Sequence, residues 1–131
     1  MNIFLLFANL LTAGAFFLHT FGGDKEILLL QPLKEDPQRS YKQGLWTMSR
    51  CGWHWISFDL LFISILLGLI NHTSYFDEKD TLLNILTIYC FGYGLSWLVT
   101  IAISKQWSRN YLKLGQWMLL WTIGILIYLG H

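Results

Sequence analysis

Charged side chains are almost absent from four long stretches of this 131-residue chain, and the absence excludes an ordinary soluble fold. A soluble helix of the same length would carry a polar face rich in Lys or Glu. Each stretch has about 19 to 24 residues, enough for a helix to cross ~30 Å of hydrocarbon. The pattern predicts an all-α fold, an integral membrane four-helix bundle formed by one domain. The predicted transmembrane helices cover about residues 2–22, 53–71, 81–104 and 112–130.

The chain also has few cysteines and prolines and little net charge. The small number of cysteines and the low net charge each exclude a class of function. The two cysteines, Cys51 and Cys90, fall at different predicted depths, which excludes a disulfide framework and a paired-cysteine metal motif. A net charge of +1 offers no basic surface for nucleic acid. No nucleophile–base pair, phosphate loop or glycine fingerprint stands out, so the sequence leans against an enzyme.

The basic residues predict the orientation of the chain in the membrane. The second connection has only Lys79, among acidic neighbours, and lies on the opposite side from the first and third connections. Basic residues gather on the cytoplasmic side of membrane proteins. We therefore expect the first and third connections in the cytoplasm and both termini outside. The other basic residues are Lys25, Lys34, Arg39, Lys42, Arg50, Lys105, Arg109 and Lys113.

The first connection has internal structure of its own. Phe21-Gly22-Gly23 predicts that the first helix ends there with a left-handed glycine cap. Residues 26–33 are apolar but too short to span, so we expect a segment in the cytoplasmic interface, or one that docks a protein partner. Asp36-Pro37 is typical of a helix start, and the helix it begins is expected to run into the second span.

Polar residues inside the predicted spans recur at helical spacing and form one stripe on each helix. Polar groups that face lipid would go unpaired, so the stripes are expected to face one another. Many of these positions are also explained by helix packing and interhelical hydrogen bonds alone. The stripe residues are Asn9, Thr12 and His19; His54, Ser57, Ser64 and Asn71; Tyr89, Tyr93, Ser96 and Thr100; and, on the fourth helix, Trp117 and Trp121 with Gln116 beside them.

Two histidines fall near the cytoplasmic ends of the first two helices. His19 and His54 are both on polar stripes, and Asp24 and Glu26 follow His19 across the glycine turn. Two imidazoles with a carboxylate are reasonable ligands for a transition metal, and two imidazoles from facing helices can hold a haem. The candidate metal set is His19, His54 and Glu26. The alternative is that each histidine bonds a carbonyl or lies among headgroups.

Asp59 is the one acidic residue inside a predicted span, where a carboxylate costs about 2.5–3.5 kcal/mol at the bilayer centre. It lies near the cytoplasmic end of its helix and does not share the stripe of His54 and Ser57. Three roles remain open: an ion pair with Arg50 or Lys113, a proton or cation site, and a contact with a second protomer.

The stretch from His19 through Gly22-Gly23, Glu26 and Pro32-Leu33 to Trp53-His54 resembles a pattern in small uncharacterised bacterial inner-membrane proteins. The resemblance covers the first helix, the first connection and the start of the second helix. It implies a bacterial inner-membrane location and draws attention to His19, Glu26 and His54. It implies no activity.

Three functions fit the sequence. The first is binding or transport of a small solute or ion through a cytoplasm-facing polar site, with His19, His54, Asp59, Glu26, Ser57, Tyr93, Ser96, Thr100 and Gln116 as candidate ligand or proton residues. The second is a redox accessory subunit that holds a metal or haem. The third is a non-catalytic envelope protein that docks a membrane protein partner or forms a homodimer. In all three the lipid bilayer is the constant partner.

Overall fold

The computed structural model describes residues 1–104 and 111–131, and within these ranges it contains helices and no strand. Among the residues that the structure describes, three helical stretches are long and apolar enough to cross a membrane: Ile3–Leu28, Arg39–His72 and Lys79–Ile103. The described chain divides into two compact units. Unit 1 comprises Met1–Leu11 with Ile65–His131, and unit 2 comprises Thr12–Ser64. The boundaries between the units fall inside the stretches Ile3–Leu28 and Arg39–His72, so each of these two stretches has residues in both units.

The first predicted span is longer than expected and does not end at the glycines. Helix α1 (Ile3–Phe17) continues into a π-helical segment η1 (Leu18–Gly23) and then into α2 (Asp24–Leu28). Gly23 has φ −69° and ψ −30°, an ordinary right-handed helical conformation, so the predicted left-handed cap is wrong. The glycine serves another purpose, because the ring of Trp53 lies against it.

The second predicted span is part of a much longer helix, α3 (Arg39–His72). Its start matches the Asp36-Pro37 signal to within a few residues: an Oδ atom of Asp36 accepts the Gln38 amide at 2.9 Å. The other Oδ atom lies 2.7 Å from Nζ of Lys42. The hydrogen bond from Lys42 and that from the Gln38 amide hold the pKa of the Asp36 carboxyl below its ordinary value. The loop before α3 is thereby fastened to the first turn of that helix.

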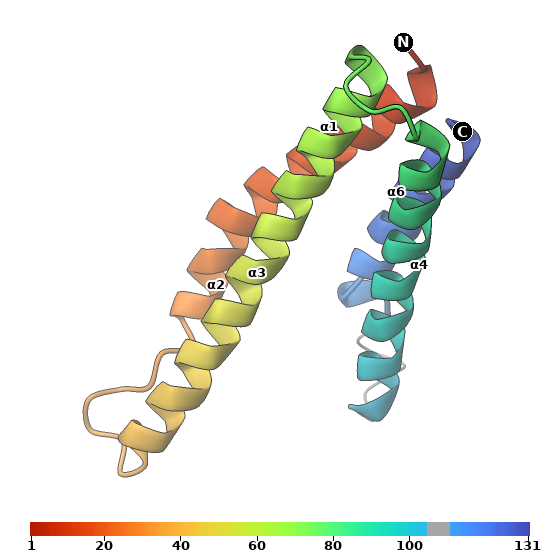
Figure 1. Cartoon of the computed structure of the whole chain (residues 1–131). Coiled ribbons are helices and arrows are strands. Elements are labelled where there is room, and N and C mark those ends of the chain that lie inside the picture. The colour runs from red at the N-terminus through yellow and green to blue at the C-terminus, as the bar shows by residue number, and fades with distance from the viewer. Residues whose placement is uncertain (105–110) are drawn as a thin grey trace. The chain divides into compact units, whose positions relative to one another are not determined.

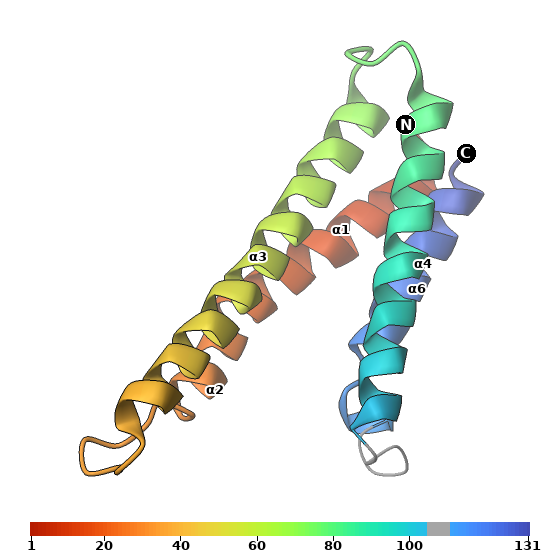
Figure 2. The ribbon, with the colours of Figure 1, turned by 60° about the horizontal axis from the view of Figure 1, so that its bottom comes forward.

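In unit 2, η1 and α2 lie beside the first half of α3 (Figures 1 and 2). Trp46 donates its indole N–H to the carbonyl of Ile27 at 2.8 Å and so holds the end of α2 to α3. Ile27 and Leu60 are buried, and Ser57 and Thr12 are the buried polar residues of this unit.

In unit 1, α4 (Lys79–Ile103) packs along α6 (Gln116–Leu129) (Figure 1). The contact face of α4 includes Cys90 and Gly94, and Gly94 lies against the indole of Trp121. Gly124 of α6 in turn faces Cys90 and Phe91. Small residues on each helix therefore receive bulky ones from the other, the packing that membrane helices favour.

The ends of unit 1 are joined by hydrogen bonds from backbone and amide groups. The amide N–H of Asn2 donates to the side-chain oxygen of Asn71 at 2.7 Å, and Asn71 donates back to the Asn2 carbonyl at 3.0 Å. The Asn2 side chain also donates to the carbonyl of Gly130 at 3.1 Å. Nζ of Lys79 donates to the carbonyls of Ile70 and Thr73, which caps the C-terminus of α3.

The fourth predicted span is shorter than expected. Helix α6 has 14 residues, about 21 Å at 1.5 Å per residue, and it begins at Gln116 rather than at residue 112. Gly115 precedes it in a non-helical conformation, and its carbonyl accepts the amide of Met118. Lys105 and Arg109 of the third connection lie outside the described residues.

Candidate functional site

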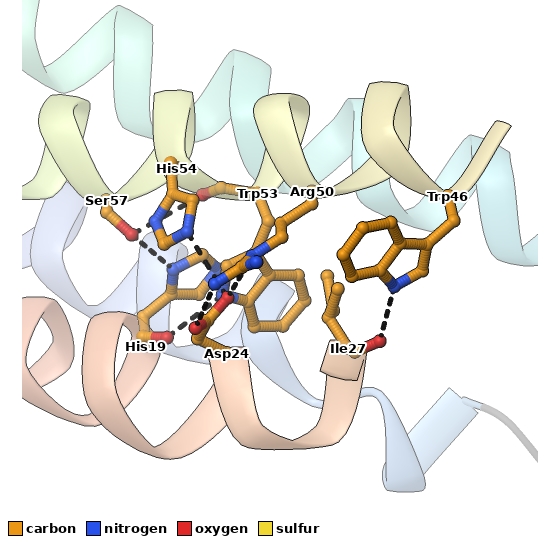
Figure 3. A network of polar contacts seen from close by, with 8 residues as sticks. All are labelled: His19, Asp24, Ile27, Trp46, Arg50, Trp53, His54 and Ser57. Carbon is orange, nitrogen blue, oxygen red and sulfur yellow. Dashed lines mark hydrogen bonds and ion pairs between the residues drawn. The ribbon is translucent and has the colours of Figure 1, made fainter. Parts of the chain in front are cut away.

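Six side chains of unit 2 form a polar cluster between the η1–α2 segment and α3 (Figure 3). We call it the α2–α3 cluster. It lies at the predicted cytoplasmic end of the first two helices, close to where the uncharged stretches stop. Its members are His19, Asp24, Arg50, Trp53, His54 and Ser57.

The centre of the α2–α3 cluster is the carboxylate of Asp24. Arg50 binds it in bidentate fashion, with Nε 2.8 Å from Oδ1 and Nη2 2.8 Å from Oδ2. Nε2 of His54 lies 3.2 Å from Oδ1. Arg50 and His54 are four residues apart on α3, so both side chains reach the same side of that helix. The Asp24 carboxylate therefore contacts both the permanently charged guanidinium of Arg50 and the imidazole of His54, which is cationic only when it is protonated.

Solvent can reach this ion pair. The Asp24 side chain is 19% exposed, whereas those of Arg50 and His54 are 35% and 43% exposed. An open hollow of about 390 Å³ adjoins Arg50 and His54, and Trp46 and Trp55 also line it. The ionic part of the cluster is thus accessible, and its carboxylate is the most covered member.

The other half of the α2–α3 cluster is built around His19. Its ring stacks on Trp53 with centroids 4.0 Å apart and planes 9° from parallel. Nδ1 of His19 lies 3.0 Å from the hydroxyl of Ser57, and the indole of Trp53 donates to the His19 carbonyl at 2.9 Å. Three contacts from α3 therefore fix both the ring and the backbone of His19.

The π-helical turn explains why Asp24 rather than Glu26 belongs to the cluster. In an unbroken α-helix, Glu26 would follow His19 by seven residues and share its face. The i→i+5 pattern of a π-helix widens the turn, so a residue five positions on comes round to nearly the same side. Asp24 is that residue, and Glu26, two positions further on α2, is exposed. Sequence periodicity alone missed this shift of phase.

Gly23 allows the η1 turn to approach α3. A Cβ atom at this position would overlap Cζ2 of Trp53 and lie 2.9 Å from Cε2. The neighbouring Gly22 has no atom within 4 Å of the same position, so only one of the two glycines is required for packing. The close approach lets the indole reach the His19 carbonyl.

The metal set His19, His54 and Glu26 is not brought together. Within residues 1–104 and 111–131, no three or more His, Cys, Asp and Glu side chains group closely enough to hold a metal ion. His19 is directed at Ser57, His54 at Asp24, and Glu26 is exposed. A metal or haem role stays a prediction from sequence, without a ligand set in the described part of the chain.

Asp59 lies outside the α2–α3 cluster. It is half-buried on α3, nine residues beyond Arg50, about 13 Å along the helix axis. Arg50 is held by Asp24 through both edges of its fork, so the suggested Arg50–Asp59 pair is replaced by the Asp24–Arg50 pair.

The remaining candidates, Tyr93, Ser96, Thr100 and Gln116, belong to unit 1. Ser96, Thr100 and Gln116 are exposed and Tyr93 is half-buried, with its ring tilted by 35° against that of Tyr89 and the two centroids 4.9 Å apart. Helix α6 covers the Cys90 and Gly94 face of α4, and the expectation that the polar stripes face one another stays a prediction. Thr100 donates its hydroxyl to the Ser96 carbonyl, a bond within its own helix that needs no second helix.

Sequence reasoning underrated three members of the cluster: Asp24, Arg50 and Trp53. A signal for Arg50 was available, because it precedes His54 by one helical turn on the same side of α3.

Comparisons of the chain with family models, with curated proteins and with solved structures found no match in any of the three.

Proposed function

We propose that the chain is a multi-pass protein of the bacterial inner membrane with both termini on the periplasmic side. Three helices of sufficient length and hydropathy support the membrane assignment. The excess of basic residues in the first and third connections supports the orientation. Helix α6 is the fourth span. At about 21 Å it is shorter than the ~30 Å hydrocarbon layer, and local thinning of the bilayer accommodates such a difference at modest cost.

The function we infer is binding or transport of a small solute or ion through the α2–α3 cluster, from the cytoplasmic side. The observation that carries this proposal is the Asp24 carboxylate, which is shared between the solvent-accessible side chains of Arg50 and His54. Histidine is the side chain whose charge commonly changes between pH 5 and 8. Since the Asp24 carboxylate is in contact with both Arg50 and His54, a charged solute that enters the cluster can take the place of either partner.

The π-helical turn adds support from backbone structure. π-helical turns within α-helices occur often at functional sites, because their widened hydrogen-bonding pattern costs stability. Here the turn positions His19 and Asp24 on the same side of the first helix, facing α3 (Figure 3).

The test is proton and cation flux in liposomes that contain the purified protein and a trapped pH-sensitive dye. We expect an imposed Na⁺, K⁺ or H⁺ gradient to change the internal pH faster than in protein-free liposomes. His19→Ala and His54→Ala should each abolish the protein-dependent flux, because each removes an imidazole from the cluster. His72→Ala is the matched control, since His72 is exposed at the other end of α3, and it should leave the flux unchanged.

Two results would count against the proposal. If the wild-type protein gives no flux above protein-free liposomes with any of the three cations, these ions are not its substrates and the transport proposal for them fails. If His19→Ala and His54→Ala fold and conduct as the wild type does, transport occurs elsewhere in the chain. Insertion and folding of each variant are checked by gel filtration in detergent.

A further inference from the structure

The open hollow of about 390 Å³ beside the α2–α3 cluster has a lining of one charge sign. Among the described residues that line it, none is acidic and Arg50 is the one with a permanent charge. A small molecule that enters the hollow therefore meets a guanidinium and an imidazole, and no carboxylate. The lining residues are Trp46, Thr47, Arg50, Cys51, His54 and Trp55.

The guanidinium of Arg50 is held in a defined orientation. Asp24 binds one edge of it through Nε and Nη2, each at 2.8 Å (Figure 3). The ring of Trp46 lies against one face, with its centroid 5.5 Å from Cζ of Arg50. A guanidinium has five N–H donors, so three remain beyond the two that Asp24 uses, both of those on Nη1 among them. A donor edge that is already oriented binds an anion with a smaller loss of conformational freedom.

The exposure of the three ionisable groups favours an anion as the ligand. Asp24 is the most covered of the three side chains, and those of Arg50 and His54 are more exposed. An anion from solution meets the positive charge of Arg50 first. A cation would have to pass that charge in order to reach the Asp24 carboxylate, and like charges repel.

The neighbouring hollow of unit 2 has a balanced charge instead. Its volume is about 410 Å³, and both Lys42 and Asp36 line it. Nζ of Lys42 lies 2.7 Å from a carboxylate oxygen of Asp36, so the cation and the acid neutralise each other inside that hollow. The two hollows have nearly the same size, and of the two the one at Arg50 suits an anion.

We propose that the hollow at Arg50 binds small organic carboxylates in which one carboxylate is joined to an aromatic or other apolar body. The carboxylate accepts hydrogen bonds from Arg50, the type of pairing that Asp24 already makes on the other edge. The apolar body lies against Trp46 and Trp55, which form the aromatic walls. Ligand pockets have about 300–1,000 Å³, so this volume suits a small molecule. The inference rests on the proposed binding role of the α2–α3 cluster and names the class of its ligand.

Protection of Cys51 in the wild-type protein tests this ligand class. Cys51 lines the hollow and is exposed, whereas Cys90 is buried, so N-ethylmaleimide reacts first with Cys51. With a Kd on the order of 1 mM for so small a ligand, we expect ~10 mM benzoate to slow this reaction roughly tenfold. Benzyl alcohol and benzylamine have the same ring with no charge or with a positive charge at neutral pH. Both should leave the rate within about twofold, because neither offers an anion to Arg50.

Arg50→Gln tests whether the guanidinium is responsible. Glutamine keeps a polar side chain but has no charge, so we expect benzoate to give this variant no protection. Lys42→Gln is the matched control, since it removes a cation about two turns earlier on α3 from the hollow with balanced charge. It should keep the roughly tenfold protection. Each rate with benzoate is divided by the rate of the same variant without it, so a change in the reactivity of Cys51 itself cancels.

Three outcomes would overturn the proposal: no protection of the wild type by benzoate, equal protection by all three ring compounds, or full protection in a folded Arg50→Gln chain. If Arg50→Gln does not fold, the three compounds on the wild-type protein still decide. The flux experiment contains none of these compounds. Flux without benzoate protection therefore overturns the ligand class alone, whereas protection without flux supports the ligand class and counts against transport.

Discussion

Gly94→Val is expected to separate α4 from α6. A Cβ atom at Gly94 already overlaps Cδ1 and Nε1 of Trp121 and lies 3.3 Å from the carbonyl of Trp117. The added methyl groups force the indole out of its place, which removes its hydrogen bond to the Phe91 carbonyl and its contact with the Phe91 ring. Overpacking of this kind costs about 1–3 kcal/mol, and we expect the apparent Tm in detergent to fall by about 5–10 °C.

Gly92→Val is the matched control for this prediction. It lies two residues earlier on the same helix, and no atom is within 4 Å of its Cβ position. Both variants carry the same cost in helix propensity, so the difference in Tm reports the contact with Trp121 alone. An equal effect of the two substitutions would mean that α6 does not pack on the Gly94 side of α4.

Gly23→Val is expected to dismantle the α2–α3 cluster. The valine side chain occupies the place of the Trp53 ring, so the indole must leave the His19 carbonyl and the stacked imidazole. Removal of Trp53 also releases the constraint that aligns His19 with Ser57. We expect a loss of about 1–3 kcal/mol in stability and complete loss of protein-dependent flux.

The control for Gly23→Val is the residue before it. Gly22→Val meets nothing within 4 Å, so it should keep the flux and lower the Tm by far less. The pair is informative because the two glycines share the same π-helical turn. If Gly22→Val proved the more damaging of the two, the η1 turn would approach α3 by a different side from the one described.

Helix positions were predictable from the sequence because the uncharged stretches are so distinct. The spans near residues 81–104 and 53–71 correspond to α4 and to the second half of α3. The fourth helix was predicted too long. Hydropathy does not distinguish a lipid-exposed helix from an apolar turn. The late start of α6 follows from the non-helical backbone conformation of Gly115, which hydropathy does not reveal.

The residues of the candidate site were predictable from the sequence only where they follow the regular 3.6-residue spacing of a single helix. His54 and Ser57 follow from the periodicity of α3, and His19 from the spacing of polar residues in the first predicted span. The sequence offered both Asp24 and Glu26, and the candidate set took Glu26 because the π-helical turn that brings Asp24 round to the His19 side is not visible in the sequence. Gly22-Gly23 was interpreted as a helix end, because the sequence does not reveal that a tryptophan thirty residues later needs the space.

The most direct test of the account uses the wild-type protein. Cys51 is exposed beside Arg50 of the α2–α3 cluster, whereas Cys90 is buried, so a membrane-impermeant maleimide reports on one side of the membrane. We expect Cys51 to react in inside-out vesicles and not in intact spheroplasts, and a Cys51→Ser, Ser74→Cys double variant to show the reverse pattern. Reaction of Cys51 in spheroplasts would place the cluster on the outer side and contradict the proposed cytoplasm-facing site.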